Sequence, residues 1–158
     1  MSAYLDGLKM LARRELSEAQ VRQRLARKGY EADAIDAAVA RLREEHAIDD
    51  RRVADAIART QTAVRRRGKL RVRREIESAG VAGPTARQAV DEVFGALDDD
   101  ALLEASLDKR LHGRKTIVDD REFRRLYRYL LGQGFEPERA LAALRKMNHK
   151  DHEDHEDS

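Results

Sequence analysis

Three segments of the chain place apolar residues at the same distances from a glycine, and this repetition constrains the fold more than any other feature. The anchors are Gly29, Gly80 and Gly134, which lie 51 and 54 residues apart. Apolar residues stand eight and four positions before each glycine, directly after it, and ten and thirteen positions after it. Segment by segment these are Val21, Leu25, Tyr30, Val39 and Leu42; Val72, Ile76, Val81, Val90 and Val93; and Leu126, Leu130, Phe135, Leu144 and Met147. Such a repeat predicts a series of similar modules.

The spacing within each segment predicts two helices joined at the glycine. Apolar residues four positions apart form one stripe on a helix, and that stripe faces a core. Glycine adopts positive φ easily and therefore ends the first helix. Pro84 and Pro137 lie near the start of the second helix, where a missing N–H costs little. Ser17 with Gln20 resembles a capping box at the start of the first helix of the first segment.

A further helical stretch precedes each pair, at residues 4–14, 51–64 and 101–111. Acidic residues open the last two stretches, which suits a helix N-terminus. Alternating runs of β-branched residues, the signature of strands, are missing. We therefore predict an all-α fold, an elongated tandem array of three three-helix repeats at residues 1–48, 49–97 and 98–147. The remainder, residues 148–158, is acidic and His-rich with almost no apolar residue, so we predict a disordered tail.

Composition excludes several classes of function. The chain has no cysteine, so it forms neither a disulfide nor a thiolate metal site. No apolar run approaches the ~20 residues of a membrane span, and the N-terminus lacks a signal-peptide pattern, so we expect a cytoplasmic protein. Phosphate-binding glycine loops and converging titratable groups are missing, which argues against an enzyme and against a cofactor. The tail histidines could hold a metal loosely, but a solvated tail explains them better.

The near balance of charge, a formal net +2, hides a strongly basic middle segment. Residues 51–80 carry ten basic and three acidic side chains. Within the stretch RRRGKLRVRREIESAG, residues 65–80, helical periodicity turns Val72 and Ile76 to a core and leaves most of the cations exposed. A solvated face accounts for part of this cluster. Because few carboxylates lie nearby, mutual repulsion among the cations favours a surface that binds an anionic partner.

The predicted binding residues are the cations of that stretch, namely Arg65, Arg66, Arg67, Lys69, Arg71, Arg73 and Arg74. A second candidate contact lies in the third repeat, at Arg124, Arg125 and Arg128. Arg13 and Arg14 in the first repeat are weaker candidates. The residues alone leave nucleic acid and acidic protein open as partners. The stretch has no aromatic residue to stack on bases, so phosphate contacts there would not read sequence.

Four segments, in this order, resemble the RecX family of bacterial regulatory proteins: LARRELSEAQVRQRLARKGY, IDDRRVADAIART, RRRGKLRVRREIESAGV and GFEPERALAAL. The resemblance covers roughly residues 4–147. Two positions depart from the family pattern, since Val53 and Ile57 stand where aromatic residues are usual. These departures thin the core of the second repeat and leave the basic stretch untouched. The His-rich tail looks like an individual extension.

The resemblance implies a concrete function in recombination, DNA repair and the SOS response. RecX proteins bind the RecA recombinase and its single-stranded-DNA filament along the filament groove. They inhibit ATP hydrolysis, strand exchange and co-protease activity, and they limit filament extension. The predicted binding residues would then meet the acidic groove or nearby phosphates, and we expect a monomer without catalytic activity. The alternatives are a sequence-independent nucleic-acid-binding protein, whose affinity must fall steeply with salt, and a helical scaffold for an unrelated acidic protein.

Overall fold

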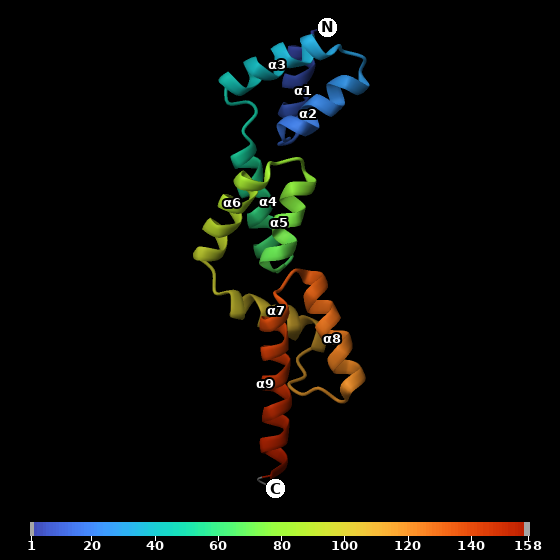
Figure 1. Ribbon diagram of the computed structural model, residues 1–158, viewed down its shortest axis with the longest axis vertical. Helices are drawn as coiled ribbons and strands as arrows, with labels where there is room; N and C mark the ends of the chain where they lie inside the picture. The colour runs from blue at the N-terminus through green and yellow to red at the C-terminus, as the bar shows by residue number, and fades with distance from the viewer. Residues whose placement is uncertain (1, 157–158) are drawn as a thin grey trace. The chain divides into compact units, whose positions relative to one another are not determined.

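A computed structural model of the protein shows a helical chain. The structure describes the backbone of residues 2–156 and the side chains of residues 2–147. The helices in chain order (Figure 1) are α1 (Ala3–Arg13), α2 (Glu18–Arg27), α3 (Ala32–Glu44), α4 (Asp50–Ala63), α5 (Lys69–Ser78), α6 (Gly83–Gly95), α7 (Asp99–Leu111), α8 (Asp120–Gln133) and α9 (Pro137–Glu156). No strand occurs between residues 2 and 156. The predicted all-α fold is confirmed.

Internal contacts divide the chain into two compact units. The first unit comprises Met1–Ala58 and Arg73–Asp91, and the second comprises Arg59–Val72 and Glu92–Ser158. Three helices begin within each predicted repeat, but the division by contacts falls inside α4, α5 and α6. A cluster of contacts and a sequence repeat are different kinds of unit, so the three repeat boundaries stay a prediction.

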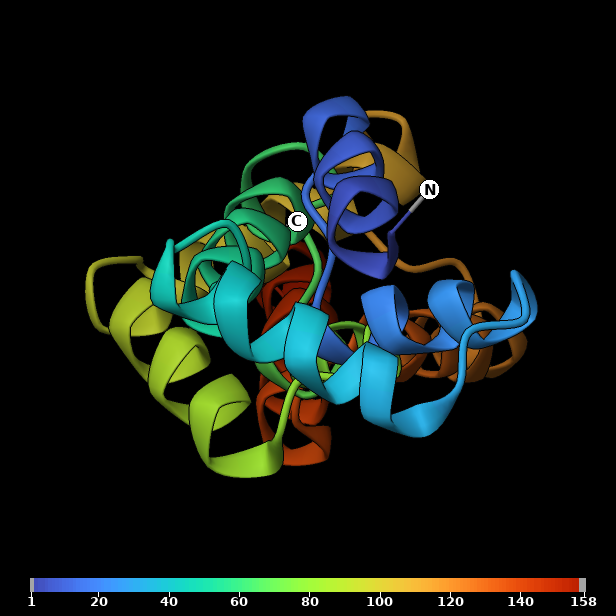
Figure 2. The same cartoon turned by 90° about the horizontal axis from the view of Figure 1, so that it is seen from above.

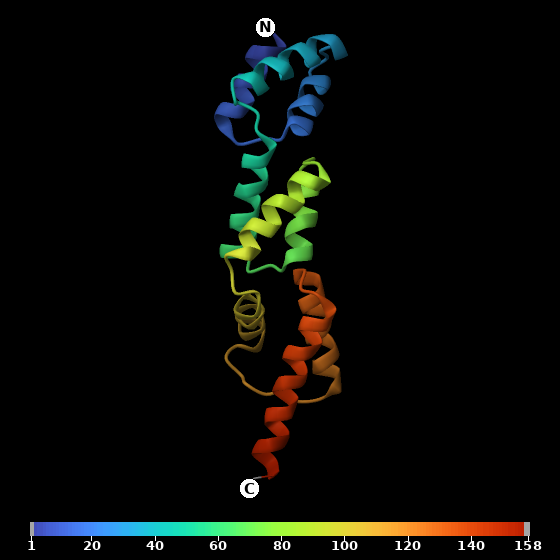
Figure 3. The same ribbon diagram turned by 60° about the vertical axis from the view of Figure 1, so that its left-hand side comes forward.

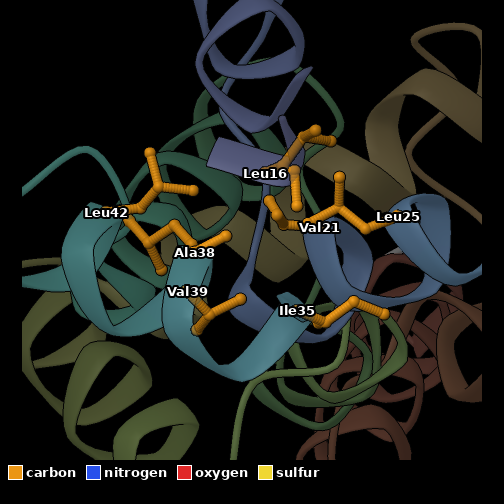
Figure 4. Packing of buried hydrophobic residues seen from close by; sticks show 9 residues of the cluster. Leu16, Val21, Leu25, Ile35, Ala38, Val39 and Leu42 are labelled. Carbon is orange, nitrogen blue, oxygen red and sulfur yellow. The ribbon is translucent and has the colours of Figure 1, made fainter. Parts of the chain in front are cut away.

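The core of the first unit lies among α1, α2 and α3. Helix α3 packs against both other helices, and Figure 2 looks down on the three of them. Side chains from α2, α3 and the segment before α2 converge in this core (Figure 4), with Leu16, Val21, Leu25, Val39 and Leu42 fully buried. Burying one such side chain contributes about 1.5–3 kcal/mol. Four of the five are anchors of the first repeat, so the predicted apolar stripes are confirmed there.

The ends of α2 follow from its flanking residues. The Ser17 hydroxyl accepts a hydrogen bond from the Gln20 amide at 3.2 Å, and the Gln20 side chain accepts one from the Ser17 amide at 3.0 Å. The predicted capping box is therefore confirmed. Gly29, just beyond the helix, has φ +95°, the left-handed conformation that glycine adopts without strain. Gly80 also has positive φ, and a Cβ there would lie only 2.5 Å from the Ala19 Cβ.

The core of the second unit lies among α7, α8 and α9. Helix α8 packs against α9 and also contacts α7 (Figure 3). The buried residues are Leu103, Leu107 and Leu111 of α7, Leu126 and Leu130 of α8, Phe135, and Ala140 and Leu144 of α9, together with Ile117. Four of the five anchors of the third repeat are thus buried as predicted, and Met147 is partly buried. The Asp98 carboxylate accepts a hydrogen bond from the Ala101 amide at 3.1 Å and begins α7, as the acidic opening indicated.

Helix α9 begins at Pro137, the expected position for a proline in the first turn. It includes backbone of the predicted tail up to Glu156. The side chains of residues 148–158 lie outside the described part of the chain, as do residues 157 and 158 altogether, and the disorder of the tail stays a prediction.

Neither membrane-spanning helices nor metal clusters occur among the described residues. Each described helix is too short or too polar to cross a membrane. No group of three or more His, Cys, Asp or Glu side chains converges as metal ligands would in that same part of the chain. The tail histidines His149, His152 and His155 are not among the side chains described.

Candidate anion-binding site

The predicted binding residues begin in the turn between α4 and α5. Past the end of α4, the Arg65 amide still donates to the Thr60 carbonyl at 3.3 Å, and the Arg67 amide donates to the Gln61 carbonyl at 3.0 Å. Arg66 has φ +52°, so the chain turns sharply there. Cations at the C-terminal end of a helix are favoured by its dipole. The sequence therefore places three arginines where the α4 dipole stabilises them.

Two glycines let this turn touch the end of α8. The Gly68 amide donates to the Gln133 carbonyl at 2.8 Å, and the Leu70 amide donates to the Gly134 carbonyl at 3.0 Å. A Cβ on Gly68 would lie 2.6 Å from backbone atoms of Gly134. A Cβ on Gly134, whose φ is +98°, would clash with the backbone of Arg71. The first turn of α5 is therefore held by backbone hydrogen bonds that only glycine permits.

Helices α7 and α8 fix the turn from another side. Ser106 of α7 is 2% exposed, and its hydroxyl donates to the Arg66 carbonyl at 2.6 Å. The Tyr129 hydroxyl donates a long hydrogen bond of 3.4 Å to the Ser106 carbonyl. Losing one partner of such a buried hydrogen bond lowers the stability of the fold by about 1–3 kcal/mol. This turn, residues 64–68 and named the arginine turn from here on, is thus anchored to the core of the second unit.

These contacts enclose a hollow of about 340 Å³, here named the second-unit hollow. Its cationic lining residues are Arg65, Arg66, Arg67 and Lys109. The remaining lining residues are Val64, Ser106, Tyr129 and Gln133. No carboxylate lines this hollow, so its charge is positive.

The cations of the second-unit hollow differ in what they already bind. Arg67 donates to the Gln61 side chain at 2.7 Å and is half-buried. Arg65, Arg66 and Lys109 are exposed, and none of them forms an ion pair within residues 2–147. Their charge is therefore available to an external anion, because no internal carboxylate neutralises it.

Lys69 and Arg71 lie next to the hollow, on the first turn of α5. The Arg71 guanidinium donates to the Gly132 carbonyl at 2.9 Å, at the C-terminal end of α8. Burial raises the pKa of the Asp99 carboxyl, and the charge of Lys69 opposes this rise only in part. The side chains of Lys69 and Arg71 are half-buried. They help to hold α5 in place, and their predicted role in binding stays a prediction.

Arg73 and Arg74 follow on α5 but belong to the first unit by its contacts. Arg73 pairs with Glu77 at 3.1 Å, one helical turn away. Arg74 is exposed and forms no ion pair among the described residues. Of these two, only Arg74 keeps an uncompensated charge.

Arg124, Arg125 and Arg128 lie on the exposed side of α8, and none of them lines the second-unit hollow. Arg125 is 3.7 Å from the buried carboxylate of Glu122, which also pairs with Arg114 at 3.2 Å. Arg124 and Arg128 form no ion pair within the described part of the chain. The structure does not bring this group together with the arginine turn, and the second contact stays a prediction.

Five lining residues were absent from the predicted site: Val64, Ser106, Lys109, Tyr129 and Gln133. Lys109 carried the clearest signal, since it lies in the last turn of α7, where a cation is favoured. Tyr129 follows the helical spacing of core residues, and its half-buried ring also packs near the Arg110 guanidinium. The polar partners of a turn that arrive from distant helices carry no signature in the sequence.

Fold and site together define a class: an all-helical protein of small helix bundles with a cationic hollow suited to an anionic macromolecule. A family model described as the first three-helix domain of RecX matches residues 3–42. Regulatory protein RecX of Syntrophotalea carbinolica is 31% identical over 84% of this chain and 88% of its own length. Regulatory protein RecX of Geobacillus kaustophilus is 33% identical over 90% of this chain, which spans only 52% of that longer protein.

The solved structures agree on the fold. The crystal structure of RecX from Lactobacillus salivarius superposes with a TM-score of 0.72, covering 92% of this chain and 94% of that one, at 16% identity. The chain belongs to the RecX family of regulatory proteins. The predicted family is therefore confirmed, and its relatives are named as regulators.

Proposed function

We propose that this chain regulates a RecA-type recombinase by binding the recombinase and its single-stranded-DNA filament. Binding would inhibit ATP hydrolysis, strand exchange and co-protease activity and limit filament extension, with no catalysis by the chain itself. The observation that carries the proposal is the relation to proteins named regulatory protein RecX across 84% of the chain. The second-unit hollow supports it, because its exposed cations suit an acidic surface or a phosphate.

The chemistry of the hollow fits such a partner. A guanidinium presents a planar fork of donors that matches a carboxylate or a phosphate. Arg65 and Arg66 present theirs from a turn that Ser106 and Gly68 fix by hydrogen bonds. A fixed turn loses little conformational freedom when a partner binds, so more of the contact energy appears as affinity.

The test is inhibition of the DNA-dependent ATPase of the cognate recombinase. The variant Arg65→Glu/Arg66→Glu reverses two exposed charges that have no internal ion pair. Each lost 1.4 kcal/mol weakens binding tenfold, so the half-inhibitory concentration should rise by about tenfold or more. Arg87→Glu/Arg145→Glu is the matched control, since both residues are exposed, form no ion pair among the described residues and lie outside the hollow. Helical circular dichroism should be unchanged in both variants.

Two results would contradict the proposal. One is full inhibition by Arg65→Glu/Arg66→Glu, and the other is an equal loss in the control, which would reduce the effect to net charge. A second candidate function is sequence-independent nucleic-acid binding. The observation that supports it is that no carboxylate lines the second-unit hollow. Titration of labelled single-stranded DNA at two salt concentrations without recombinase separates the two: tight, salt-steep binding favours the alternative.

A further inference from the structure

The first unit carries a second cationic hollow, far from the predicted binding residues in the sequence. This first-unit hollow, of about 460 Å³, is formed by α1 and α2. Its cations are Lys9, Arg13, Arg14, Arg24, Arg27 and Lys28, against the single carboxylate of Asp6. The only other lining residue is Met10. The charge around the hollow is therefore strongly positive.

The cations gather because α1 and α2 pack side by side and both carry basic residues along the hollow. Arg13 lies in the last turn of α1, and Arg14 caps that helix. Arg24 and Arg27 lie in the last turn of α2, and Lys28 caps it. A helix C-terminus stabilises cations, so each helix end tolerates basic residues on its own. Their convergence on one hollow is a property of the fold and exceeds what either helix end requires.

The Asp6 carboxylate accounts for only part of this charge. Asp6 is 5% exposed; it accepts a hydrogen bond from the Tyr30 hydroxyl and lies 3.7 Å from the Lys28 ammonium. The hydrogen bond from Tyr30 is the main reason why the pKa of Asp6 lies below its ordinary value, and the charges of Lys28 and Lys9 lower it further. Asp6 is therefore ionised and engages the two lysines.

The four arginines remain uncommitted. Arg13, Arg14, Arg24 and Arg27 form no ion pair with any carboxylate in the part of the chain that the structure describes. Three of them are exposed, and Arg24 is half-exposed. Four unscreened guanidiniums around one concave surface repel one another, and a polyanion relieves that repulsion.

The lining distinguishes between two kinds of polyanion. The buried centre of a protein–protein interface is enriched in aromatic residues and depleted of charge. Protein–nucleic-acid interfaces are far more positively charged and more polar. The first-unit hollow has one half-buried methionine, no aromatic side chain and six cations. Its chemistry therefore matches a chain of phosphates better than an acidic protein segment.

We propose that the first-unit hollow binds the phosphodiester backbone of nucleic acid, with Arg13, Arg14, Arg24 and Arg27 as its phosphate ligands. Recognition is independent of base sequence, because no aromatic ring lines the hollow for stacking. This site is separate from the second-unit hollow, and it stands whether or not the chain inhibits a recombinase. It gives the first unit a nucleic-acid contact of its own.

The experiment measures DNA binding by the full chain without recombinase. A labelled oligothymidylate of about 20 nucleotides exceeds the site size of one small binding module, and its fluorescence anisotropy is followed at several salt concentrations. In Arg13→Gln/Arg14→Gln/Arg24→Gln/Arg27→Gln, four phosphate contacts are lost. The slope of log Kd against log salt should become shallower by about 2–3, since each contact to a single strand contributes about 0.7.

Three further variants decide what the change means: the quadruple lysine variant, Arg13→Gln/Arg14→Gln and Arg87→Gln/Arg145→Gln. Lysine at the same four positions keeps the charge and should retain most of the parent slope. The double variant Arg87→Gln/Arg145→Gln removes two exposed cations elsewhere and should change the slope less than Arg13→Gln/Arg14→Gln does. Thermal unfolding by circular dichroism checks that all variants are folded.

The possible outcomes are distinct. A shallower slope in the glutamine variant with recovery in the lysine variant supports the site. Parent-like binding by the folded glutamine variant overturns it, and so does a loss that lysine fails to restore. If that variant binds DNA like the parent but no longer inhibits the recombinase, the hollow takes an acidic protein segment instead. Arg65→Glu/Arg66→Glu in the same titrations reports on the second-unit hollow, so failure of one proposal is separable from failure of the other.

Discussion

Replacing Gly134 by alanine tests whether the close backbone contact between α8 and α5 stabilises the second unit. Gly134 ends α8 with φ +98°, and its carbonyl accepts the Leu70 amide while the neighbouring Gln133 carbonyl accepts the Gly68 amide. A Cβ at this position would collide with the backbone of Arg71. Alanine therefore strains the left-handed residue and also forces α5 away from α8.

Alanine should lower the free energy of unfolding more at Gly134 than at Gly29. A left-handed conformation costs an L-residue about 1–2 kcal/mol. Losing the two inter-helix hydrogen bonds adds about 1 kcal/mol each. Gly134→Ala should thus destabilise the second unit by about 3–4 kcal/mol. Gly29→Ala is the matched control because its φ is +95° and nothing lies within 4 Å of a Cβ there, so only the conformational cost of about 1–2 kcal/mol applies.

Urea unfolding followed by circular dichroism at 222 nm measures both changes. Gly29 belongs to the first unit and Gly134 to the second, so separate transitions, where they occur, should each respond to one variant. Gly80→Ala should also destabilise more than Gly29→Ala, because its Cβ would lie 2.5 Å from the Ala19 Cβ, which is fixed to the backbone. Equal losses in Gly29→Ala and Gly134→Ala would refute the reasoning, since the conformational cost alone would then explain both.

Three smaller perturbations test other contacts. Ser17→Ala removes the α2 cap and the hydroxyl that donates to the Ala79 carbonyl. Urea unfolding should show a loss of about 1–3 kcal/mol. Glu31→Ala is the control, since Glu31 is the α3 cap and makes no side-chain hydrogen bond there, and its effect should stay within about 0.5 kcal/mol. Tyr30→Phe should raise the pKa of Asp6 in a carboxyl NMR titration. Because the folded pKa of Asp6 is depressed, its stabilisation is present above the unfolded pKa and is lost as pH falls through the folded one, so the destabilisation by Tyr30→Phe should be full at pH 7 and vanish in acid. Ser106→Ala should cost about 1–3 kcal/mol by the same unfolding assay and weaken recombinase inhibition, because the Arg66 carbonyl loses its donor.

The sequence predicts much of the local structure because local structure depends on near neighbours. The apolar residues around Gly29 and Gly134 are buried as their spacing indicates, except for Tyr30 and Met147, which are partly buried, and the Ser17 capping box forms. These features follow from periodicity and from the conformational freedom of glycine. The close approach of Gly68 to Gly134 was not predicted, because it depends on how α5 and α8 meet.

The candidate sites were predictable only in part for the same reason. The arginine turn is visible as a run of charge, but Lys109 reaches it from α7 and Ser106 fixes it from the same helix. The first-unit hollow joins Arg13, a weaker candidate in the sequence, to Arg24, which lies in a separate stretch and was not predicted. Charge density marks a cationic segment, whereas convergence of cations from two helices is set by helix packing.

The hydrogen bonds from Gly68 and Ser106 have a thermodynamic consequence for whatever docks at the arginine turn. Ordering a loop of five residues on binding would cost roughly 1–2 kcal/mol for each residue fixed. The turn is ordered already, so association there should proceed as rigid docking, with a rate governed by diffusion and charge steering. Its calorimetric signature should then lack the large unfavourable entropy of coupled folding.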